Sequence, residues 1–192
     1  MNESQLQLPS LSKYKPRRNL PKRSSLKRKE LLFGRAFVSA FLADNPRYIG
    51  SVVQEVSLNG YGIADLVCLK RRRFGKDVGD NVGKAPVIMA FELKMSDWRK
   101  ALSQAFRYRY FAHVSIVVLP AGEVHRASRF LGTFRMFKVG LWAFDKGTGQ
   151  IRKLWTPRSS KPLSSQAQRR ATVMITKQLD LREPPELSDP LS

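Results

Sequence analysis

The stretch VIMAFELK, residues 87–94, and the stretch GIADLV, residues 62–67, decide the fold of this chain. Each is an apolar run of strand length, and each carries charge where a buried strand normally carries none. Because side chains alternate along a strand, Glu92 and Lys94 project from the same face. An unpaired ionised carboxylate in a core is strongly unfavourable, so such a group is normally paired or holds a metal ion. If the two strands are neighbours, Asp65 joins the pair, and two acids meet one ammonium group.

A structural ion pair is the simplest alternative explanation of this pattern. A salt bridge between Glu92 and Lys94 accounts for both of these charges. It leaves Asp65 on the other strand unexplained, however. Two acids and a lysine at one point suit a divalent metal ion and an activated water molecule.

Composition indicates a compact, strongly basic protein. The 192 residues are 42% hydrophobic, and 35 Lys and Arg oppose 15 Asp and Glu, which gives a formal net charge of +20. A surplus of this size favours an anionic polymer as partner, because basic side chains release counterions condensed on phosphates. We expect no membrane partner, since no apolar run has the length of a bilayer span. The single cysteine, Cys68, excludes an intramolecular disulfide and a cysteine-cluster zinc site, and favours an intracellular protein, cytoplasmic, nucleoid-associated or nuclear.

The chain divides into three stretches. Residues 1–27 form a predicted flexible basic arm, because the first 29 residues hold nine Lys or Arg and one acid, Glu3, without apolar periodicity. Residues 28–156 form the predicted compact domain. Residues 157–192 form a predicted C-terminal tail with a short helix.

Periodicity and turn residues give the expected order of elements. A helix contains the apolar residues between 31 and 41 and ends at Asn45-Pro46, and another begins at Ser96 or Asp97 and reaches about 111. The remaining elements follow from the same criteria: strands over 47–58, 63–69, 87–94, 114–119, 138–144 and 151–155, and helices over 123–134 and 164–179. Three sequential strands followed by a helical crossover predict an α/β fold with a mixed central β-sheet flanked by helices.

This order of elements and acids resembles the PD-(D/E)xK nuclease superfamily, which includes restriction endonucleases, Holliday-junction resolvases and repair nucleases. The resemblance covers residues 28–145 and rests on Asp65 in the second strand and Glu92-Leu93-Lys94 in the third. A glutamine and a tyrosine four residues apart, Gln104 and Tyr108, follow in the next helix, as in several branches of the superfamily. Ala64 stands where the family name implies proline. The resemblance implies a restriction-endonuclease-like αβββαβ core, so the compact domain is expected to be nuclease-like.

The same resemblance implies the roles of the site residues. Asp65 and Glu92, with the backbone carbonyl of Leu93, are expected to bind Mg²⁺ or Mn²⁺. Lys94 is expected to orient the attacking water or to neutralise the phosphate. Gln104 and Tyr108 share a helical face and are expected to position water, Lys94 or the substrate. A further acid is expected from Glu30 in the first helix or from Glu55 in the first strand.

Clustered basic residues are candidates for contacts with nucleic-acid phosphates. They lie in the arm, in the basic loop over residues 70–84 and in the helix after the Glu-Leu-Lys triplet. The candidates are Arg17, Arg18, Lys22, Arg23, Arg71, Arg72, Arg73, Arg99, Lys100 and Arg107. Aromatic residues alternate with arginines in the last of these segments, as in grooves that track a backbone and stack bases, although the same helix could equally pack its aromatics inward.

The sequence therefore predicts a Mg²⁺- or Mn²⁺-dependent deoxyribonuclease, an endonuclease that hydrolyses DNA, with branched or damaged DNA as candidate substrates. One alternative is a non-catalytic nucleic-acid-binding subunit of a larger assembly, because the charge requires no active site. Another is an RNA-processing nuclease. The candidate partners are DNA or RNA and, beyond these, a second copy of the chain, which cleavage of both strands would favour, or a larger nucleoprotein assembly.

Overall fold

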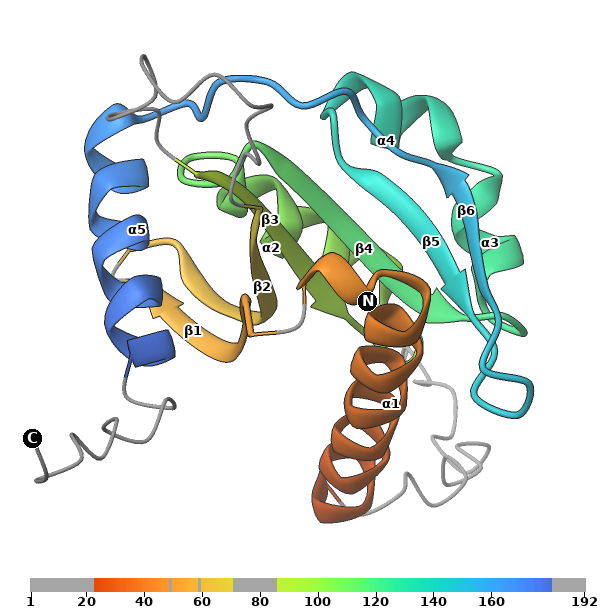
Figure 1. Cartoon of the computed structure of the whole chain (residues 1–192). Coiled ribbons are helices and arrows are strands. Elements are labelled where there is room, and N and C mark those ends of the chain that lie inside the picture. The colour runs from red at the N-terminus through yellow and green to blue at the C-terminus, as the bar shows by residue number, and fades with distance from the viewer. Residues whose placement is uncertain (1–22, 49, 59, 71–85, 181–192) are drawn as a thin grey trace, which may run out of the picture.

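The computed structural model describes residues 23–48, 50–58, 60–70 and 86–180, and it describes side chains from residue 28 onward. Its centre is a six-stranded mixed sheet whose strand order follows the chain order (Figure 1). The strands are β1 Val52–Leu58, β2 Gly62–Lys70, β3 Val87–Leu93, β4 Val114–Pro120, β5 Gly140–Phe144 and β6 Ile151–Trp155. The β1–β2, β2–β3 and β5–β6 pairs are antiparallel, whereas β3–β4 and β4–β5 are parallel. The α/β class and the mixed sheet flanked by helices are confirmed.

Helix α1, Arg23–Asp44, covers one face of the sheet with aromatic side chains. Phe33, Phe37 and Phe41 recur at helical spacing, and each is almost completely buried. The Phe91 ring of β3 lies 5.6 Å from that of Phe37 and 5.2 Å from that of Phe41, in edge contacts favourable for aromatic pairs. This packing fixes α1 against the strand that carries Glu92.

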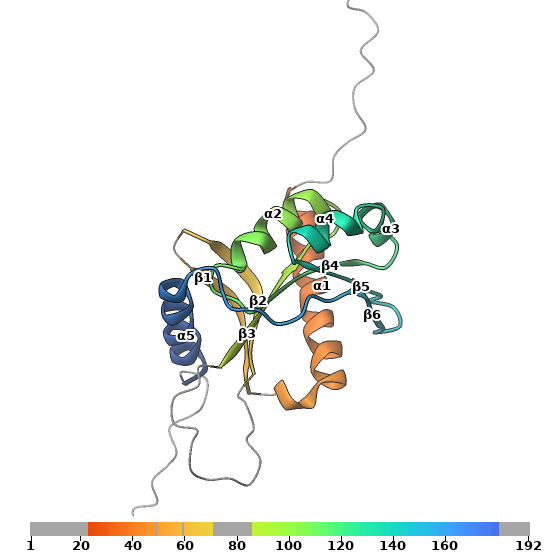
Figure 2. The same ribbon diagram turned by 90° about the horizontal axis from the view of Figure 1, so that it is seen from above.

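The other face is covered by α2 Trp98–Tyr108, α3 Val124–Ser128 and α4 Leu131–Met136, so the sheet lies between α1 and these helices (Figure 2). Asp97 caps α2, because its side chain accepts a hydrogen bond from the Lys100 backbone at 3.1 Å. Ala101 and Ala105 are fully buried. Small residues at these positions let α2 approach β3 and β4 closely, which brings the end of α2 to the sheet.

The C-terminal helix expected over 164–179 is present as α5, Ser165–Asp180. It packs against β1 at the edge of the sheet (Figure 1). Ala167, Ala171 and Ile175 are buried at helical spacing and belong to the same core as α2. Part of the segment predicted as a tail therefore contributes to the core.

Two expected elements differ from the structure. The strand predicted over 47–58 begins only at Val52, because a 3₁₀ helix, η1 Pro46–Tyr48, follows α1 and a turn at Gly50 precedes the sheet. The helix predicted over 123–134 is split into α3 and α4. The backbone leaves helical geometry at Phe130, whose ring stacks on Trp98 at 4.8 Å.

Among the residues that the structure describes, no helix is long and apolar enough to cross a membrane. Much of the predicted basic arm and the predicted loop over 70–84 lie outside the described residues. The candidate phosphate-binding side chains Arg17, Arg18, Lys22, Arg23, Arg71, Arg72 and Arg73 therefore receive no structural description.

Candidate active site

The pairing of β2 with β3 brings the two predicted acids together. Leu66 pairs with Phe91 in this antiparallel ladder, so the next opposed pair is Asp65 and Glu92. The Asp65 carboxylate reaches across to β3, where Oδ2 accepts a hydrogen bond of 2.7 Å from the Leu93 backbone N–H. The expectation that the second and third strands are neighbours, with Asp65 beside the end of the third, is therefore confirmed.

Asp65 lies in a partly enclosed environment. Burial raises the pKa of its carboxyl above the ordinary value, and the negative charges of Glu30 and Glu55 act in the same direction. The Leu93 N–H and the positive charge of Lys94 oppose this rise. Two further acids close enough to perturb Asp65 indicate that negative charge is concentrated here.

Glu92 is the only charged residue among the fully buried side chains of the described chain, with 1% of its surface exposed. Its Oε2 lies 2.5 Å from the Tyr108 hydroxyl, which donates to it, and its Oε1 lies 3.4 Å from Lys94 Nζ. Burial, reinforced by the charge of Asp65, raises the pKa of Glu92 to about 7. Oε1 is buried, and its contact among the described residues is the ion pair with Lys94.

Lys94 connects the acids of the sheet with α1. Its Nζ lies 3.4 Å from Glu92 and 4.0 Å from Glu30, and its backbone N–H donates to the Val118 carbonyl at 3.1 Å. Burial lowers the pKa of the ammonium group, but attraction to Glu92, Glu30 and Asp65 outweighs burial and the net shift is upward. The amine is therefore held in its charged form.

Both candidates for a further acid lie near Asp65. A cavity of about 340 Å³ is bounded by Glu30, Arg35, Gln54, Glu55, Asp65 and Leu93, and we call it the acidic cavity. Glu55 reaches it from β1, between Gln54 and Val56, which pair with Leu66 and Ala64 of β2, and it has a left-handed backbone with φ of 54°. Glu30 reaches it from α1 and also pairs with Lys94, a contact that Glu55 does not make in the described structure.

The two residues predicted from α2 differ in their contacts. The Tyr108 side chain is fully buried, and its hydroxyl lies 2.6 Å from the Ile63 carbonyl as well as beside Glu92. Burial and the neighbouring charge of Glu92 raise the pKa of Tyr108, so the phenol stays protonated. Gln104, one turn earlier, has a buried Oε1 with no hydrogen-bond partner among the described residues. The structure thus brings Tyr108, but not Gln104, into direct contact with the acids.

The described residues contain no group of three or more His, Cys, Asp or Glu side chains arranged to hold a metal ion. Asp65 faces the Leu93 N–H, and Glu92 faces Tyr108 and Lys94. Mg²⁺ commonly keeps several waters and takes only one or two carboxylates from the protein. Two opposed carboxylates with a buried acceptor oxygen on Glu92 therefore fit a hard, oxygen-seeking cation.

The surface basic residues predicted from α2 are exposed. Arg99 stacks over the Trp98 ring at 4.4 Å and over Phe130 at 5.4 Å, while Lys100 and Arg107 extend into solvent. The aromatic residues that alternate with these arginines make ring contacts within the protein. Phe106, for example, packs against Phe137. Tyr110 keeps 37% of its surface exposed and stacks on Tyr61.

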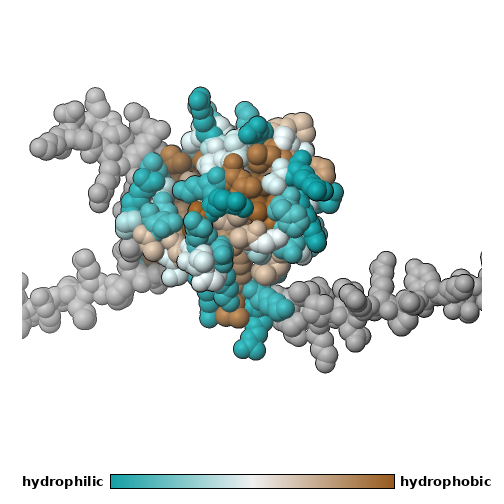
Figure 3. Space-filling model, turned by 90° about the vertical axis from the view of Figure 1, so that its right-hand side faces the viewer, coloured by the Kyte–Doolittle hydropathy of each residue, from teal (hydrophilic) through white to brown (hydrophobic). Residues whose placement is uncertain are grey.

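The face on the right-hand side of Figure 1 has apolar surface in its middle, bordered by hydrophilic side chains (Figure 3). Sequence reasoning gave no role to Lys29, Met95 or Lys146, which line a second cavity beside this site. The available signal was their position: Met95 lies two residues after β3, and Lys146 lies two residues after β5. Ligands of open α/β sheets commonly bind at such strand ends.

Comparison of the chain with protein-family models, curated proteins and solved structures gives no match. The interpretation of the site therefore depends on its own residues and on the resemblance of their order to a nuclease superfamily.

Proposed function

We propose that this protein is a divalent-metal-dependent endonuclease that hydrolyses phosphodiester bonds of DNA, with branched or damaged DNA as candidate substrates. The observation that carries the proposal is Glu92, a buried carboxylate opposite Asp65 and in contact with Lys94. A structural ion pair explains Glu92 and Lys94, but it does not explain why Asp65 and Glu30 lie beside them in a chain with few acids.

The order of elements supports membership of the PD-(D/E)xK superfamily. Helix α1, the antiparallel strands β1–β3, helix α2 and the parallel strand β4 follow the αβββαβ order implied by the resemblance. Asp65 lies in the second strand and Glu92 at the end of the third. We therefore assign the core to the restriction-endonuclease-like class as part of this proposal.

In this proposal Asp65 and Glu92 hold Mg²⁺ or Mn²⁺, with the Leu93 carbonyl as a further oxygen ligand. The cation, when bound, lowers the pKa of a coordinated water and neutralises charge on the phosphate. Lys94 carries a fixed positive charge at the edge of this pair. Because a protonated amine donates hydrogen bonds and accepts none, Lys94 orients the attacking water through its oxygen or binds the phosphate, and it does not remove a proton.

Tyr108 acts as a positioning residue for Glu92. A phenol has one proton, yet the Tyr108 oxygen is close to both Glu92 Oε2 and the Ile63 carbonyl. The single proton serves one of these two acceptors at a time, and its donation to Glu92 Oε2 lowers the pKa of this carboxyl against the rise that burial causes. A cation held by Asp65 and Glu92 would favour the ionised form of Glu92, and the Tyr108 hydroxyl would fix the orientation of that carboxylate by donating to Oε2.

Cleavage assays test the proposal directly. Supercoiled plasmid, a four-way junction and a single-stranded oligonucleotide are incubated with the protein in Mg²⁺ or Mn²⁺ and in EDTA. We expect metal-dependent strand cleavage that is lost in Asp65→Asn and in Lys94→Ala. Asp180→Asn, a substitution of the exposed acid that ends α5, is the matched control and is expected to keep full activity. Equal cleavage by Asp65→Asn and the parent would overturn the catalytic assignment.

The non-catalytic alternative has support of its own in the exposed residues Arg99, Lys100 and Arg107, which need no active site to bind phosphate. Salt-sensitive binding without cleavage in any divalent metal would favour it, and the slope of log affinity against log salt would count the phosphate contacts. Competition between matched DNA and RNA oligonucleotides distinguishes the DNA enzyme from an RNA-processing nuclease.

A further inference from the structure

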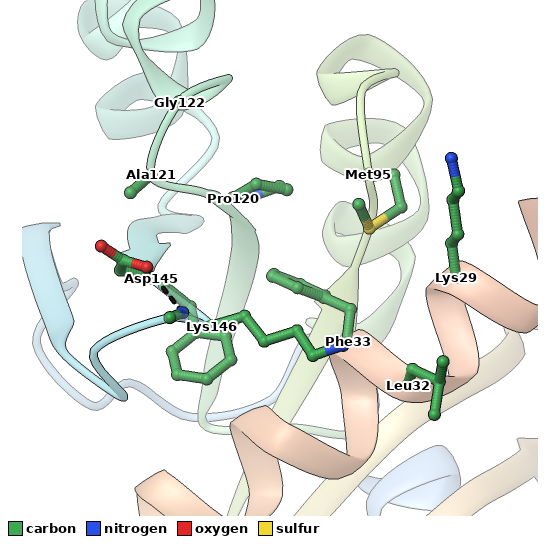
Figure 4. Close-up of a pocket in the computed structure, with 11 residues that line it drawn as sticks. Lys29, Leu32, Phe33, Met95, Pro120, Ala121, Gly122, Asp145 and Lys146 are labelled. Carbon is green, nitrogen blue, oxygen red and sulfur yellow. Dashed lines mark hydrogen bonds between the residues drawn. The ribbon is translucent and has the colours of Figure 1, made fainter.

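A second cavity lies next to the acids, where the parallel strands β3, β4 and β5 end (Figure 4). Its volume is about 320 Å³, at the lower end of the range of about 300–1,000 Å³ for small-molecule sites. We call it the strand-end cavity. Its lining includes Lys29, Leu32, Phe33, Met95, Phe144 and Lys146.

The inner wall of the strand-end cavity is apolar. Phe33 and Phe144 are almost completely buried, and their ring centroids lie 5.4 Å apart. Met95 points into the same space in Figure 4, and Leu32 keeps 43% of its surface exposed at the mouth. Flat rings and a thioether form the type of surface on which a planar aromatic ligand packs.

The rim of this cavity is basic. Lys29 comes from α1, and Lys146 comes from the turn after β5 (Figure 4). The one acid there, Asp145, is engaged locally, because its Oδ1 accepts backbone hydrogen bonds from Gly147 at 2.8 Å and from Thr148 at 3.4 Å. Two ammonium groups beside an apolar wall suit a ligand that has both a ring and a phosphate.

The strand-end cavity continues the candidate active site on two sides. Met95 directly follows Lys94 at the end of β3, and Lys29 directly precedes Glu30 on α1. The acidic cavity and the strand-end cavity therefore lie on adjacent faces of α1, and Lys94 stands between Leu93 of the first and Met95 of the second. A polynucleotide with one phosphate at Lys94 has its neighbouring nucleotide within reach of the strand-end cavity.

We propose that the strand-end cavity receives one unpaired nucleotide next to the phosphodiester at the acids. The base packs against Leu32 and Met95, and Lys29 and Lys146 contact the adjoining phosphates. A base that is stacked and paired in a duplex cannot enter a cavity without leaving the helix, so the preferred substrate has an unpaired nucleotide at the cleavage position. This inference rests on the proposed nuclease function and names its substrate class: single-stranded, flapped or bulged DNA.

Two DNA substrates of identical sequence separate the possibilities, one fully paired and one with a single unpaired nucleotide. Stacking of a base on protein side chains contributes about 1–3 kcal/mol, so we expect wild-type kcat/KM to favour the unpaired substrate by about tenfold or more. Leu32→Trp fills the mouth of the cavity and is expected to bring this ratio close to one. Met136→Trp, on the exposed surface of α4, is the control and is expected to keep the wild-type ratio.

Binding without cleavage supplies a second readout. With 2-aminopurine as the unpaired base, we expect its fluorescence to fall when metal-free wild-type protein binds. The decrease should be smaller with Leu32→Trp, and Lys146→Ala should raise the Kd severalfold. If wild type cleaves both substrates equally and quenches no fluorescence, the inference is wrong while the nuclease function stands. If neither substrate is cleaved but the quenching depends on Leu32, the catalytic proposal fails and the nucleotide site remains.

Discussion

The acidic cavity and the strand-end cavity share helix α1 but carry opposite charge. Glu30, Glu55 and Asp65 surround the first, with Arg35 at its edge. Lys29 and Lys146 surround the second, with Asp145 held in a turn. In a chain of net charge +20, acids are scarce, so their concentration on one side of α1 requires a local explanation. The contrast indicates a cation site at the acidic cavity and an adjacent site for an anionic substrate at the strand-end cavity.

Removal of the acids should have the largest effect. We expect Asp65→Asn and Glu92→Gln to lower cleavage by at least about 100-fold, because loss of a metal ligand exceeds the loss of 10–100-fold that is usual for groups behind the ligands. Lys146→Ala should lower it much less, since that residue contacts only the substrate. Initial rates at saturating Mn²⁺ measure the difference. Comparable losses in all three variants would contradict the division between the two cavities.

The stability of the metal-free protein should depend on pH through Glu92. Its folded-state pKa of about 7 lies above the ordinary 4.5, so the folded protein binds this proton more tightly than the unfolded chain does. This proton stabilises the folded state fully below pH 4.5. The stabilisation is lost as the pH rises to about 7, which lowers the free energy of unfolding by up to about 3 kcal/mol. Urea unfolding between pH 4.5 and 8 should show this loss in wild type and a smaller loss in Glu92→Gln.

Mn²⁺ should reverse the pH dependence of stability, because the metal binds the ionised carboxylate of Glu92 and competes with the proton. We therefore expect the Kd for Mn²⁺ to rise as pH falls below about 7. Isothermal titration in EDTA-treated protein measures it. A Kd that does not change between pH 6 and 8 would remove Glu92 from the ligand set.

Tyr108→Phe should have an intermediate effect. The substitution keeps the buried ring but leaves the Ile63 carbonyl and Glu92 Oε2 without their partner, at a stability cost of about 1–3 kcal/mol. Loss of this donor raises the pKa of Glu92 further, so the acidic limb of the pH–rate profile should move to higher pH. A purely structural role would lower stability without moving that limb. Phe106→Leu, on the same helix, is the control.

Arg99→Ala should have the smallest effect. Its guanidinium stacks on Trp98 at the surface, and such exposed contacts contribute about 0.5–1 kcal/mol. If Arg99 also contacts a phosphate, the slope of log affinity against log salt should decrease by about one. An unchanged slope would restrict Arg99 to a packing role outside the nucleic-acid interface.

The sequence sufficed for those parts of the site that depend on local rules. Strand alternation and the antiparallel pairing of β2 with β3 place Asp65 and Glu92 opposite each other, and the capped helix α2 brings Tyr108 to Glu92. The same rules put Gln104 on that face, but they do not determine hydrogen-bond partners, and the Oε1 atom of Gln104 has none among the described residues. Which residue supplies the further acid also depends on how α1 is rotated on the sheet, a property of aromatic packing at Phe33, Phe37 and Phe41.

The strand-end cavity could not be predicted in this way, since its residues come from positions between 29 and 147. Each is ordinary in its own segment: Met95 and Leu32 resemble core residues, and Lys146 resembles a turn residue. Their proximity exists only after the strands are aligned. The split of the helix expected over 123–134 had a similar cause, because the stacking of Phe130 on Trp98 joins segments that are distant in the chain.

The sequential order of the six strands also bears on how fast the chain reaches its native state. Each new strand pairs with the one made just before it, so none has to be inserted between two that are already joined. Short sequence separations between partners lower contact order and favour rapid folding. Asp65 and Glu92 belong to the second and third strands, so during synthesis from the N-terminus their pairing can precede the arrival of β4–β6.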